Sequence, residues 1–301
     1  MYGFLKYWLN VSSPPTPPRP EFDTPWRQVT WSEDKKNEML KKLKEFQLST
    51  PDVDQLKILL HGPIGAGKSS FINSVHTALQ GRSTAVAPAN SAAGDSYSFT
   101  TKFKFYRLKK DGSGSFYPFV FTDVMGMEHG RSKGVHTDDI ISILHGHIKN
   151  GYTFNPCCPI DKENPNYISD PSLKDRVHCL VSVLPANKIS LTSDDVIHKM
   201  KQVREKARDL GIPQVTVMTM VDEACPLVRD DLEKIYTSKK IKEKMQECSN
   251  KLGVPMNCIY PVKNYHEKIT NDLNADILIL MSVTDIISFA NDYIEDQIYT
   301  E

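Results

Sequence analysis

Short apolar runs and amphipathic segments alternate along most of the chain. Runs typical of buried strands fall at residues 56–60, 177–184, 214–218 and 256–261. Helical spacing of apolar residues, with caps and stops at its ends, predicts helices at residues 33–46, 69–81, 137–149, 193–209, 229–236, 238–252 and 274–298. This alternation predicts an α/β fold with a doubly wound, mostly parallel sheet and flanking helices.

The connection between the first strand and the second helix carries the most specific pattern in the sequence. It matches G-x-x-x-x-G-K-[ST] at every fixed position, with Gly62, Pro63, Ile64, Gly65, Ala66, Gly67, Lys68 and Ser69. Such a loop can wrap backbone N–H groups around phosphate oxygens at a helix N-terminus. Lys68 can reach the β- and γ-phosphates, and the Ser69 hydroxyl can ligate Mg²⁺. This loop, with Ser70 after it, therefore predicts a P-loop NTPase fold and nucleotide binding.

A hairpin follows the P-loop helix. Residues 101–108 alternate with strand period, residues 111–114 read Asp-Gly-Ser-Gly, and residues 116–122 form a second apolar strand. A P-loop nucleotide kinase would have a parallel crossover here, whereas GTPases have an antiparallel edge strand followed by D-x-x-G. Asp123-Val124-Met125-Gly126 supplies that motif. The Asp123 carboxylate is expected to hold Mg²⁺ and the Gly126 N–H to sense the γ-phosphate.

A threonine before the edge strand is expected to complete the metal site. Thr100 and Thr101 are both candidates, and the sequence does not choose between them. The predicted metal ligands are Ser69, Thr101 and Asp123, with Thr100 as the alternative threonine. Lys68 and the two threonines are the groups predicted to act in catalysis.

The base is predicted from T-M-V-D at residues 219–222. Asp222 stands where GTPases use an aspartate to read guanine, while Thr219 and Met220 replace the usual Asn and Lys. Lys263 and Asn264, after the last strand, are expected to complete the base site. Met127 occupies the position where Ras-like enzymes carry a water-orienting Gln. Hydrolysis of GTP to GDP is therefore expected to be slow in isolation, unless His129 or a second subunit assists.

Composition narrows the partners and the compartment. The 301 residues include 37 basic and 37 acidic side chains, so nothing favours a nucleic-acid partner. No uninterrupted apolar run of about eighteen residues predicts a transmembrane segment. The six cysteines lack C-x-x-C spacing and suit free thiols, which predicts a cytoplasmic protein. We expect an aromatic and proline-rich strap with a helix at residues 1–54, and a P-loop GTP-binding domain with its C-terminal helix at residues 55–301.

Four stretches resemble the interferon-induced protein 44 and 44-like family. They are G-P-I-G-A-G-K-S-S-F-I-N-S-V (62–75), S-F-T-T-K (98–102), T-D-V-M-G-M (122–127) and P-V-K-N-Y (261–265). The resemblance implies a cytoplasmic, interferon-induced GTP-binding protein linked to antiviral responses. Some members carry an N-terminal TLDc domain, and the segment before the first strand is too short to hold one.

Three hypotheses follow. In the first, GTP and Mg²⁺ order residues 90–102 and 123–135, and the ordered surface recruits a second copy or another protein. In the second, the chain is a non-hydrolysing scaffold that GDP stabilises. In the third, it is an ATP-using P-loop enzyme whose acceptor lid is formed by residues 150–175.

Overall fold

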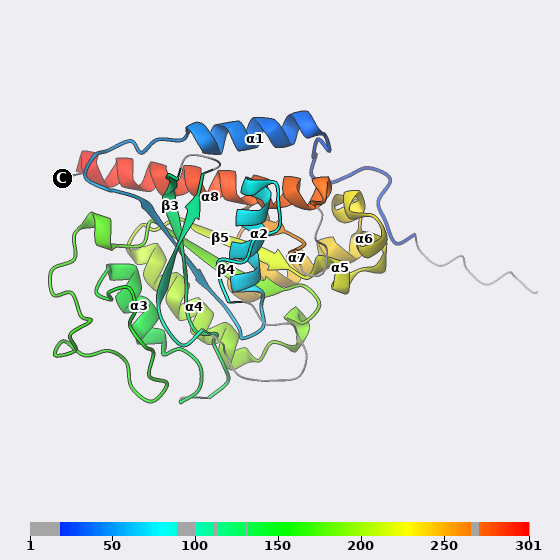
Figure 1. The fold of residues 1–301 in the computed structure, drawn as a ribbon. Coiled ribbons are helices and arrows are strands. Elements are labelled where there is room, and N and C mark those ends of the chain that lie inside the picture. The colour runs from blue at the N-terminus through cyan, green and yellow to red at the C-terminus, as the bar shows by residue number, and fades with distance from the viewer. Residues whose placement is uncertain (1–18, 89–99, 111–113, 131, 266–270, 301) are drawn as a thin grey trace, which may run out of the picture.

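A single sheet forms the centre of the molecule (Figure 1). The computed structural model describes residues 19–88, 100–110, 114–130, 132–265 and 271–300. Within them, six strands lie in the order β2-β3-β1-β4-β5-β6, and every neighbouring pair is parallel except β2–β3. The strands are β1 Leu56–His61, β2 Lys104–Lys109, β3 Phe116–Asp123, β4 Cys179–Pro185, β5 Gln214–Thr219 and β6 Ile259–Pro261. The predicted α/β class, with an antiparallel edge strand, is confirmed.

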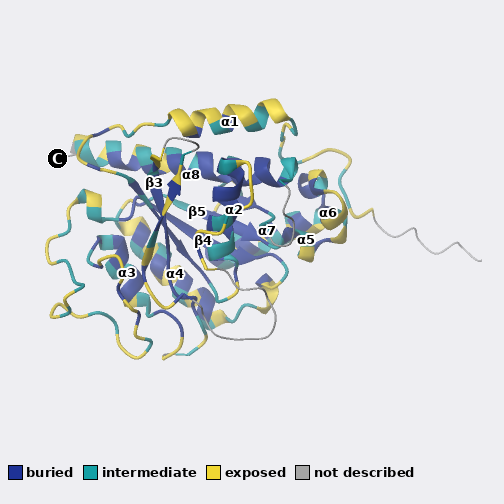
Figure 2. Cartoon of the chain, viewed as in Figure 1, coloured by how far each residue is buried: buried dark blue, intermediate teal, exposed yellow. Residues whose placement is uncertain are grey.

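Helices cover both faces of the sheet. One face carries α2 (Lys68–Gln80) and α8 (Leu273–Thr300), and the other carries α3 (Thr137–His145), α4 (Asp194–Asp209) and α7 (Lys239–Leu252). Two short helices, α5 (Val221–Ala224) and α6 (Pro226–Asp230), follow β5. Short 3-10 turns lie at Leu173–Asp175, Ile189–Leu191, Leu232–Tyr236 and Met256–Cys258. All strands except the edge strand β2 are buried along most of their length, as Figure 2 shows.

The first helix forms an outer layer. In α1 (Glu33–Glu45) the Ser32 hydroxyl accepts a hydrogen bond from the Lys35 amide, which satisfies one of the unpaired N–H groups of the first turn. Met39 and Leu43 are buried. This helix does not pack on the sheet: α1 lies on α8, which separates it from the strands (Figure 1).

Three element boundaries also differ from the prediction. Helix α3 ends at His145 rather than near residue 149, because Gly146 adopts a left-handed conformation and its amide turns back onto the carbonyls of Ile143 and Ser142. The segment predicted as one helix at 229–236 is the end of α6 followed by a 3-10 turn. A 3-10 turn also precedes β6, so that strand begins at Ile259.

The C-terminal helix α8 is more apolar than expected from the lack of a long uninterrupted apolar run in the sequence. Within the described residues, the span Leu273–Tyr299 is long and apolar enough, with a mean hydropathy of 1.6, to cross a membrane by length and composition alone. The charges of Asp276 and Asp285 interrupt its apolar run and hid this property. In the fold, 61% of the apolar window is buried, which is typical of a core helix.

The described part of the N-terminal strap lies against the end of the domain that carries α6 and α7. The Arg27 guanidinium donates to the carbonyls of Met256 and Ile259 and to the Tyr236 hydroxyl, and it stacks on the Tyr236 ring. Trp26 meets Tyr236 edge to face. Residues 1–18 of the predicted strap lie outside the described residues. All six cysteines are free thiols.

Candidate functional site

The P-loop connects the carboxyl end of β1 to the first turn of α2. Gly62 has φ +150°, and a Cβ there would lie 2.1 Å from the Val183 carbonyl oxygen, so only glycine fits. Gly67 is left-handed, with φ +86°, at the N-cap of α2. The Lys68 ammonium donates to the carbonyls of Gly62 (3.2 Å) and Pro63 (3.0 Å). The loop is thus closed on its own lysine, at a helix N-terminus that favours anions.

Two hydroxyls converge on one buried carboxylate beside this loop. Ser69 Oγ donates to Asp123 Oδ2 at 2.5 Å, and Thr100 Oγ1 donates to the same oxygen at 3.2 Å. Asp123 is fully buried, and its Oδ1 has no hydrogen-bond partner among the described side chains and backbone groups. Thr101, the threonine first predicted as a metal ligand, is exposed. Oxygen ligands of this kind fit Mg²⁺, and the orphaned Oδ1 is the atom that such an ion would satisfy.

Burial and mutual attraction set the charges at this point. Burial raises the pKa of the Asp123 carboxyl, while Lys68 and the hydroxyls of Ser69 and Thr100 oppose that rise. Burial likewise lowers the pKa of the Lys68 ammonium, and Asp123 opposes that change. Each group therefore depends on the other to stay charged. A site with these two charges at its floor is suited to a phosphate tail accompanied by a divalent cation.

The segment after D-x-x-G is bonded directly to the P-loop. The Ile64 amide donates to the Met127 carbonyl (3.2 Å), and the Met127 amide donates to the Gly62 carbonyl (3.0 Å). Gly126 packs so closely that a Cβ would lie 2.6 Å from the Ile64 Cα. Met127 is 1% exposed and belongs to the hydrophobic core. The residue at the usual water-orienting position is therefore an internal packing residue.

Helix α4 contacts residues 128–130, which follow the D-x-x-G motif. The sequence did not predict this contact. Lys199 donates to the carbonyls of Glu128 and Gly130, both at 2.7 Å, and pairs with Asp195 at 3.3 Å. Asp195 accepts in turn from the Gly130 amide at 3.0 Å. The i, i+4 spacing of Asp195 and Lys199 was the available signal, but it is also common on solvent-exposed helix faces.

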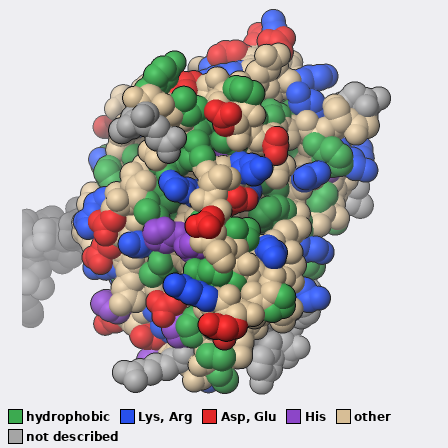
Figure 3. Space-filling model, turned by 90° about the vertical axis from the view of Figure 1, so that its left-hand side faces the viewer, with side chains coloured by type: hydrophobic (Ala, Val, Ile, Leu, Met, Phe, Trp, Pro, Cys, Tyr) green, Lys and Arg blue, Asp and Glu red, His purple; other side chains and the backbone are tan. Residues whose placement is uncertain are grey.

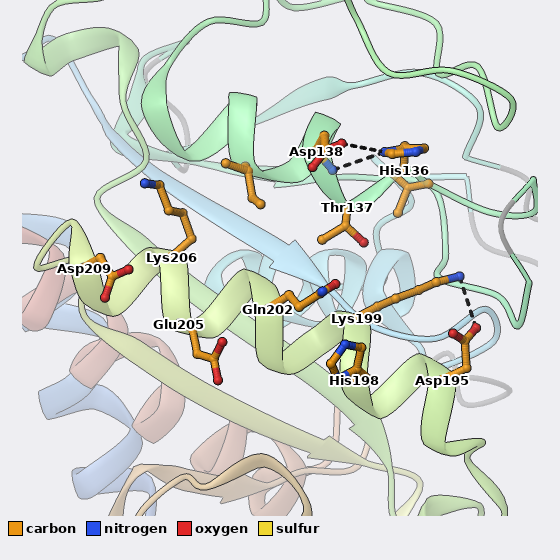
Figure 4. A pocket seen from close by; sticks show the side chains of 12 residues that line it. His136, Thr137, Asp138, Asp195, His198, Lys199, Gln202, Glu205, Lys206 and Asp209 are labelled. Atoms are coloured by element: carbon orange, nitrogen blue, oxygen red, sulfur yellow. Dashed lines mark hydrogen bonds and ion pairs between the residues drawn. The ribbon is translucent and has the colours of Figure 1, made fainter.

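The cavity beside this contact lies away from the P-loop. It has a volume of about 670 Å³ and lies between α3 and α4, as the side chains in Figure 4 show. Its lining mixes both signs of charge, with His136, Asp138, His198, Glu205 and Lys206 among its residues. On the face drawn in Figure 3, acidic and basic side chains are likewise interspersed.

The predicted base residues lie together on the other side of the P-loop. Asp222 pairs with Lys263 at 3.4 Å, and Asn264 Nδ2 donates to the Gly67 carbonyl at 3.2 Å. The Thr219 hydroxyl donates to the Ala66 carbonyl at 2.7 Å, so it links β5 to the phosphate loop. Met220 is the one non-glycine residue of the described chain with positive φ, +55°. This turn starts α5 and places Asp222 in its first turn.

The structure thus brings most predicted site residues to the carboxyl edge of the sheet. Gly65 and Ser70 lie in the loop and in the first turn of α2, and Gly126 lies against Ile64. Thr101 is the predicted residue whose side chain faces solvent. No group of three or more His, Cys, Asp or Glu residues in the described chain could hold a metal.

Two curated human relatives align along most of the chain. Interferon-induced protein 44-like is 32% identical over 270 residues, which cover 90% of this chain and 59% of the relative. Interferon-induced protein 44 is 34% identical over 258 residues, which cover 86% of this chain and 57% of the relative. The chain therefore spans a little under three fifths of the length of these relatives. The resemblance drawn from the four motifs is confirmed.

Other comparisons are more distant. No protein-family model matches the chain. Toc33 from Arabidopsis thaliana, solved with Mg²⁺ and GMPPNP, is 16% identical and has a TM-score of 0.47, with 86% of this chain and 92% of that chain covered. The fold class rests on the strand order and the P-loop of this chain rather than on that likeness.

Proposed function

This chain is a relative of the interferon-induced protein 44 and 44-like proteins, and we propose that it is a Mg²⁺-dependent guanine-nucleotide-binding protein with slow or partner-assisted GTP hydrolysis. The observation that carries the proposal is the convergence of Ser69 and Thr100 on Asp123 beside the P-loop. A phosphate-binding loop, a hydroxyl from its helix and a carboxylate at the end of the neighbouring strand are the parts that a P-loop nucleotide site needs.

Different residues of the site would bind the phosphates, the metal ion and the base. Backbone amides of the loop from Gly65 to Ser69 would hold the phosphates, and Lys68 would leave its loop carbonyls to pair with them. Ser69, Thr100 and Asp123 would hold Mg²⁺, which supplies charge neutralisation at the β- and γ-phosphates. Asp222 would accept hydrogen bonds from the guanine N1 and N2 groups.

We further propose the biological setting that the relatives' names suggest. The chain would be interferon-induced and would act in the cytoplasm as part of an innate antiviral response. Six free thiols are compatible with a reducing compartment. Nucleotide exchange would change its association with a second copy or with another protein, which light scattering in GDP and in a GTP analogue would detect as a change of mass.

Titration calorimetry of the purified chain with GDP, GTP and ATP tests the proposal. We expect guanine nucleotides to bind and Lys68→Ala to weaken them at least about tenfold, since a charged hydrogen bond contributes about 1.5–3 kcal/mol. Lys240→Ala, at an exposed position of α7, is the matched control. If Lys68→Ala binds as tightly as the parent, or if ATP binds better than GTP, the proposal is wrong.

A further inference from the structure

Three successive residues after β6 fasten three different parts of the nucleotide site. Lys263 pairs with Asp222 on the base side, and Asn264 Nδ2 donates to the Gly67 carbonyl of the P-loop. The Tyr265 amide donates to Ser74 Oγ on α2 at 2.9 Å. The Ser74 hydroxyl donates in turn to the carbonyl of Ser70, the residue after Ser69, at 2.7 Å. We call residues 263–265 the clip.

The buried carboxylate of Asp276 holds the clip through the Tyr265 side chain. The Tyr265 hydroxyl donates to Asp276 Oδ1 at 2.7 Å and accepts from the Asp272 amide at 2.8 Å. Asp276 lies in the first turn of α8 and is 0% exposed. A buried carboxylate is costly unless charges and hydrogen bonds satisfy it. Its position, and that of the tyrosine bonded to it, therefore depend on the partners of its second oxygen.

The charged partner of that second oxygen comes from the N-terminal helix. Lys36 Nζ lies 3.0 Å from Asp276 Oδ2, and the Lys36 side chain is 14% exposed. The same ammonium lies 3.8 Å from Glu33 on its own helix. Asn271 Nδ2 also donates to Asp276 Oδ2, at 3.3 Å. A chain of polar contacts thus runs from α1 through α8 to the clip, although α1 itself lies outside the two layers that enclose the sheet.

We infer that Lys36 is a positioning residue for the nucleotide site, which acts through Asp276 and Tyr265 to hold the clip against the P-loop and the base-reading Asp222. The inference rests on the proposed function. Without the Lys36 charge, Asp276 is left buried with neutral donors, and it regains solvation by moving together with Tyr265. The clip then loosens at Gly67 and Asp222 at once. In this view α1 is a part of the nucleotide site that controls how fast the nucleotide leaves.

The test measures GDP dissociation from the full chain by displacement of a fluorescent GDP. We expect Lys36→Met and Tyr265→Phe each to speed dissociation by about tenfold, which corresponds to about 1.4 kcal/mol. Lys35→Met is the matched control, because Lys35 pairs with Glu38 on the exposed face of the same helix. Lys36→Arg, which keeps the charge, should restore the parent rate.

Two further readouts separate positioning from general stability. If both residues act through one chain of contacts, the double variant Lys36→Met with Tyr265→Phe should release GDP no faster than the faster single variant. The unfolding temperature without nucleotide reports the structural effect alone. A Lys36→Met protein that melts lower yet releases GDP at the Lys35→Met rate would overturn the inference while leaving the proposed function intact. A parent chain that binds no guanine nucleotide would overturn the proposed function and the inference with it.

Discussion

The ammonium of Lys263 lies 3.4 Å from the carboxylate of Asp222, and each side chain is about one quarter exposed. GTPases of the N-K-x-D type carry their lysine two residues before the aspartate, a position that Met220 occupies here. In this chain the positive charge beside the Asp222 carboxylate, which we propose reads the base, therefore comes from the segment that follows β6. The contact with Lys263 holds the Asp222 side chain in one orientation, and a carboxylate is the acceptor that guanine N1 and N2 need.

Replacing that carboxylate should change which base is bound. In Asp222→Asn, an amide replaces one acceptor by a donor, so one of the two hydrogen bonds to guanine N1 and N2 is lost and two donors face each other there. We expect the GDP affinity to fall about a hundredfold and xanthosine diphosphate to become the better ligand, since hydrogen bonds to charged groups contribute about 1.5–3 kcal/mol. Competition binding with both nucleotides measures the change. Asp230→Asn, in an exposed pair with Arg229, serves as the control. An unchanged preference would instead favour an ATP-using enzyme.

Substitutions of the neighbouring Thr100 and Thr101 should differ in how much Mg²⁺ the variant needs to bind a nucleotide. Thr100 donates to Asp123, whereas Thr101 is exposed, so Thr100→Val should remove a Mg²⁺ ligand and Thr101→Val should not. We expect Thr100→Val to need at least about tenfold more Mg²⁺ for GTP-analogue binding, as expected for the loss of one of few protein ligands. A Mg²⁺ titration at fixed nucleotide measures this. A larger effect at Thr101 would show that the bound state uses the other threonine.

Local patterns carried the parts of this site that could be predicted. The loop from Gly62 to Ser69 and the motif at Asp123 are defined by fixed spacings that the backbone geometry demands, so the sequence identifies them directly. The contacts of Lys199 with residues 128–130, and of Lys36 with Asp276, join segments far apart in the chain. Charged residues on amphipathic helices do not reveal their partners. The amphipathic pattern of α1 likewise predicted a buried face without showing that α8, rather than the sheet, covers it.

A buried histidine should make the fold sensitive to mild acid. His178 Nδ1 accepts from the Lys57 amide at 2.9 Å, while Nε2 faces the Leu173 carbonyl at 3.0 Å, so the neutral ring with its proton on Nε2 fits. Burial lowers the pKa of His178 to about 4, below the ordinary value of 6.5. Between these values the unfolded chain binds a proton that the folded chain does not. The free energy of unfolding is therefore unaffected by His178 above pH 6.5. It falls by about 1.4 kcal/mol for each pH unit from there down to about pH 4.

Urea unfolding between pH 7 and pH 5 measures this slope. His178→Asn keeps an acceptor for the Lys57 amide but cannot titrate, so the slope of the free energy of unfolding against pH should decrease, by a loss that approaches one proton near pH 5. His198→Asn, at an exposed position on α4, should change the slope less. His61, whose pKa is lowered to about 3 by burial and by Lys68, acts in the same direction in both variants. An unaltered slope in His178→Asn would mean that this ring is protonated in the folded state.

A glutamine at position 127, the residue of Ras-like enzymes, should not speed GTP hydrolysis by this chain. Both backbone groups of Met127 are bonded to the P-loop, and its side chain is 1% exposed within the core, so a glutamine there would point away from the phosphates. We expect Met127→Gln to lower the free energy of unfolding by about 1–3 kcal/mol, the cost of a buried amide without partners. Its single-turnover GTP hydrolysis should stay within about threefold of the parent rate, which we expect to be slow, since an orienting group that is misplaced contributes nothing. Met127→Leu, which conserves volume, is the control for packing.

Two results would contradict this prediction. Hydrolysis tenfold faster in Met127→Gln would show that this segment leaves the P-loop when GTP is bound. Fast hydrolysis by the parent monomer would show that another residue of the chain already orients the water.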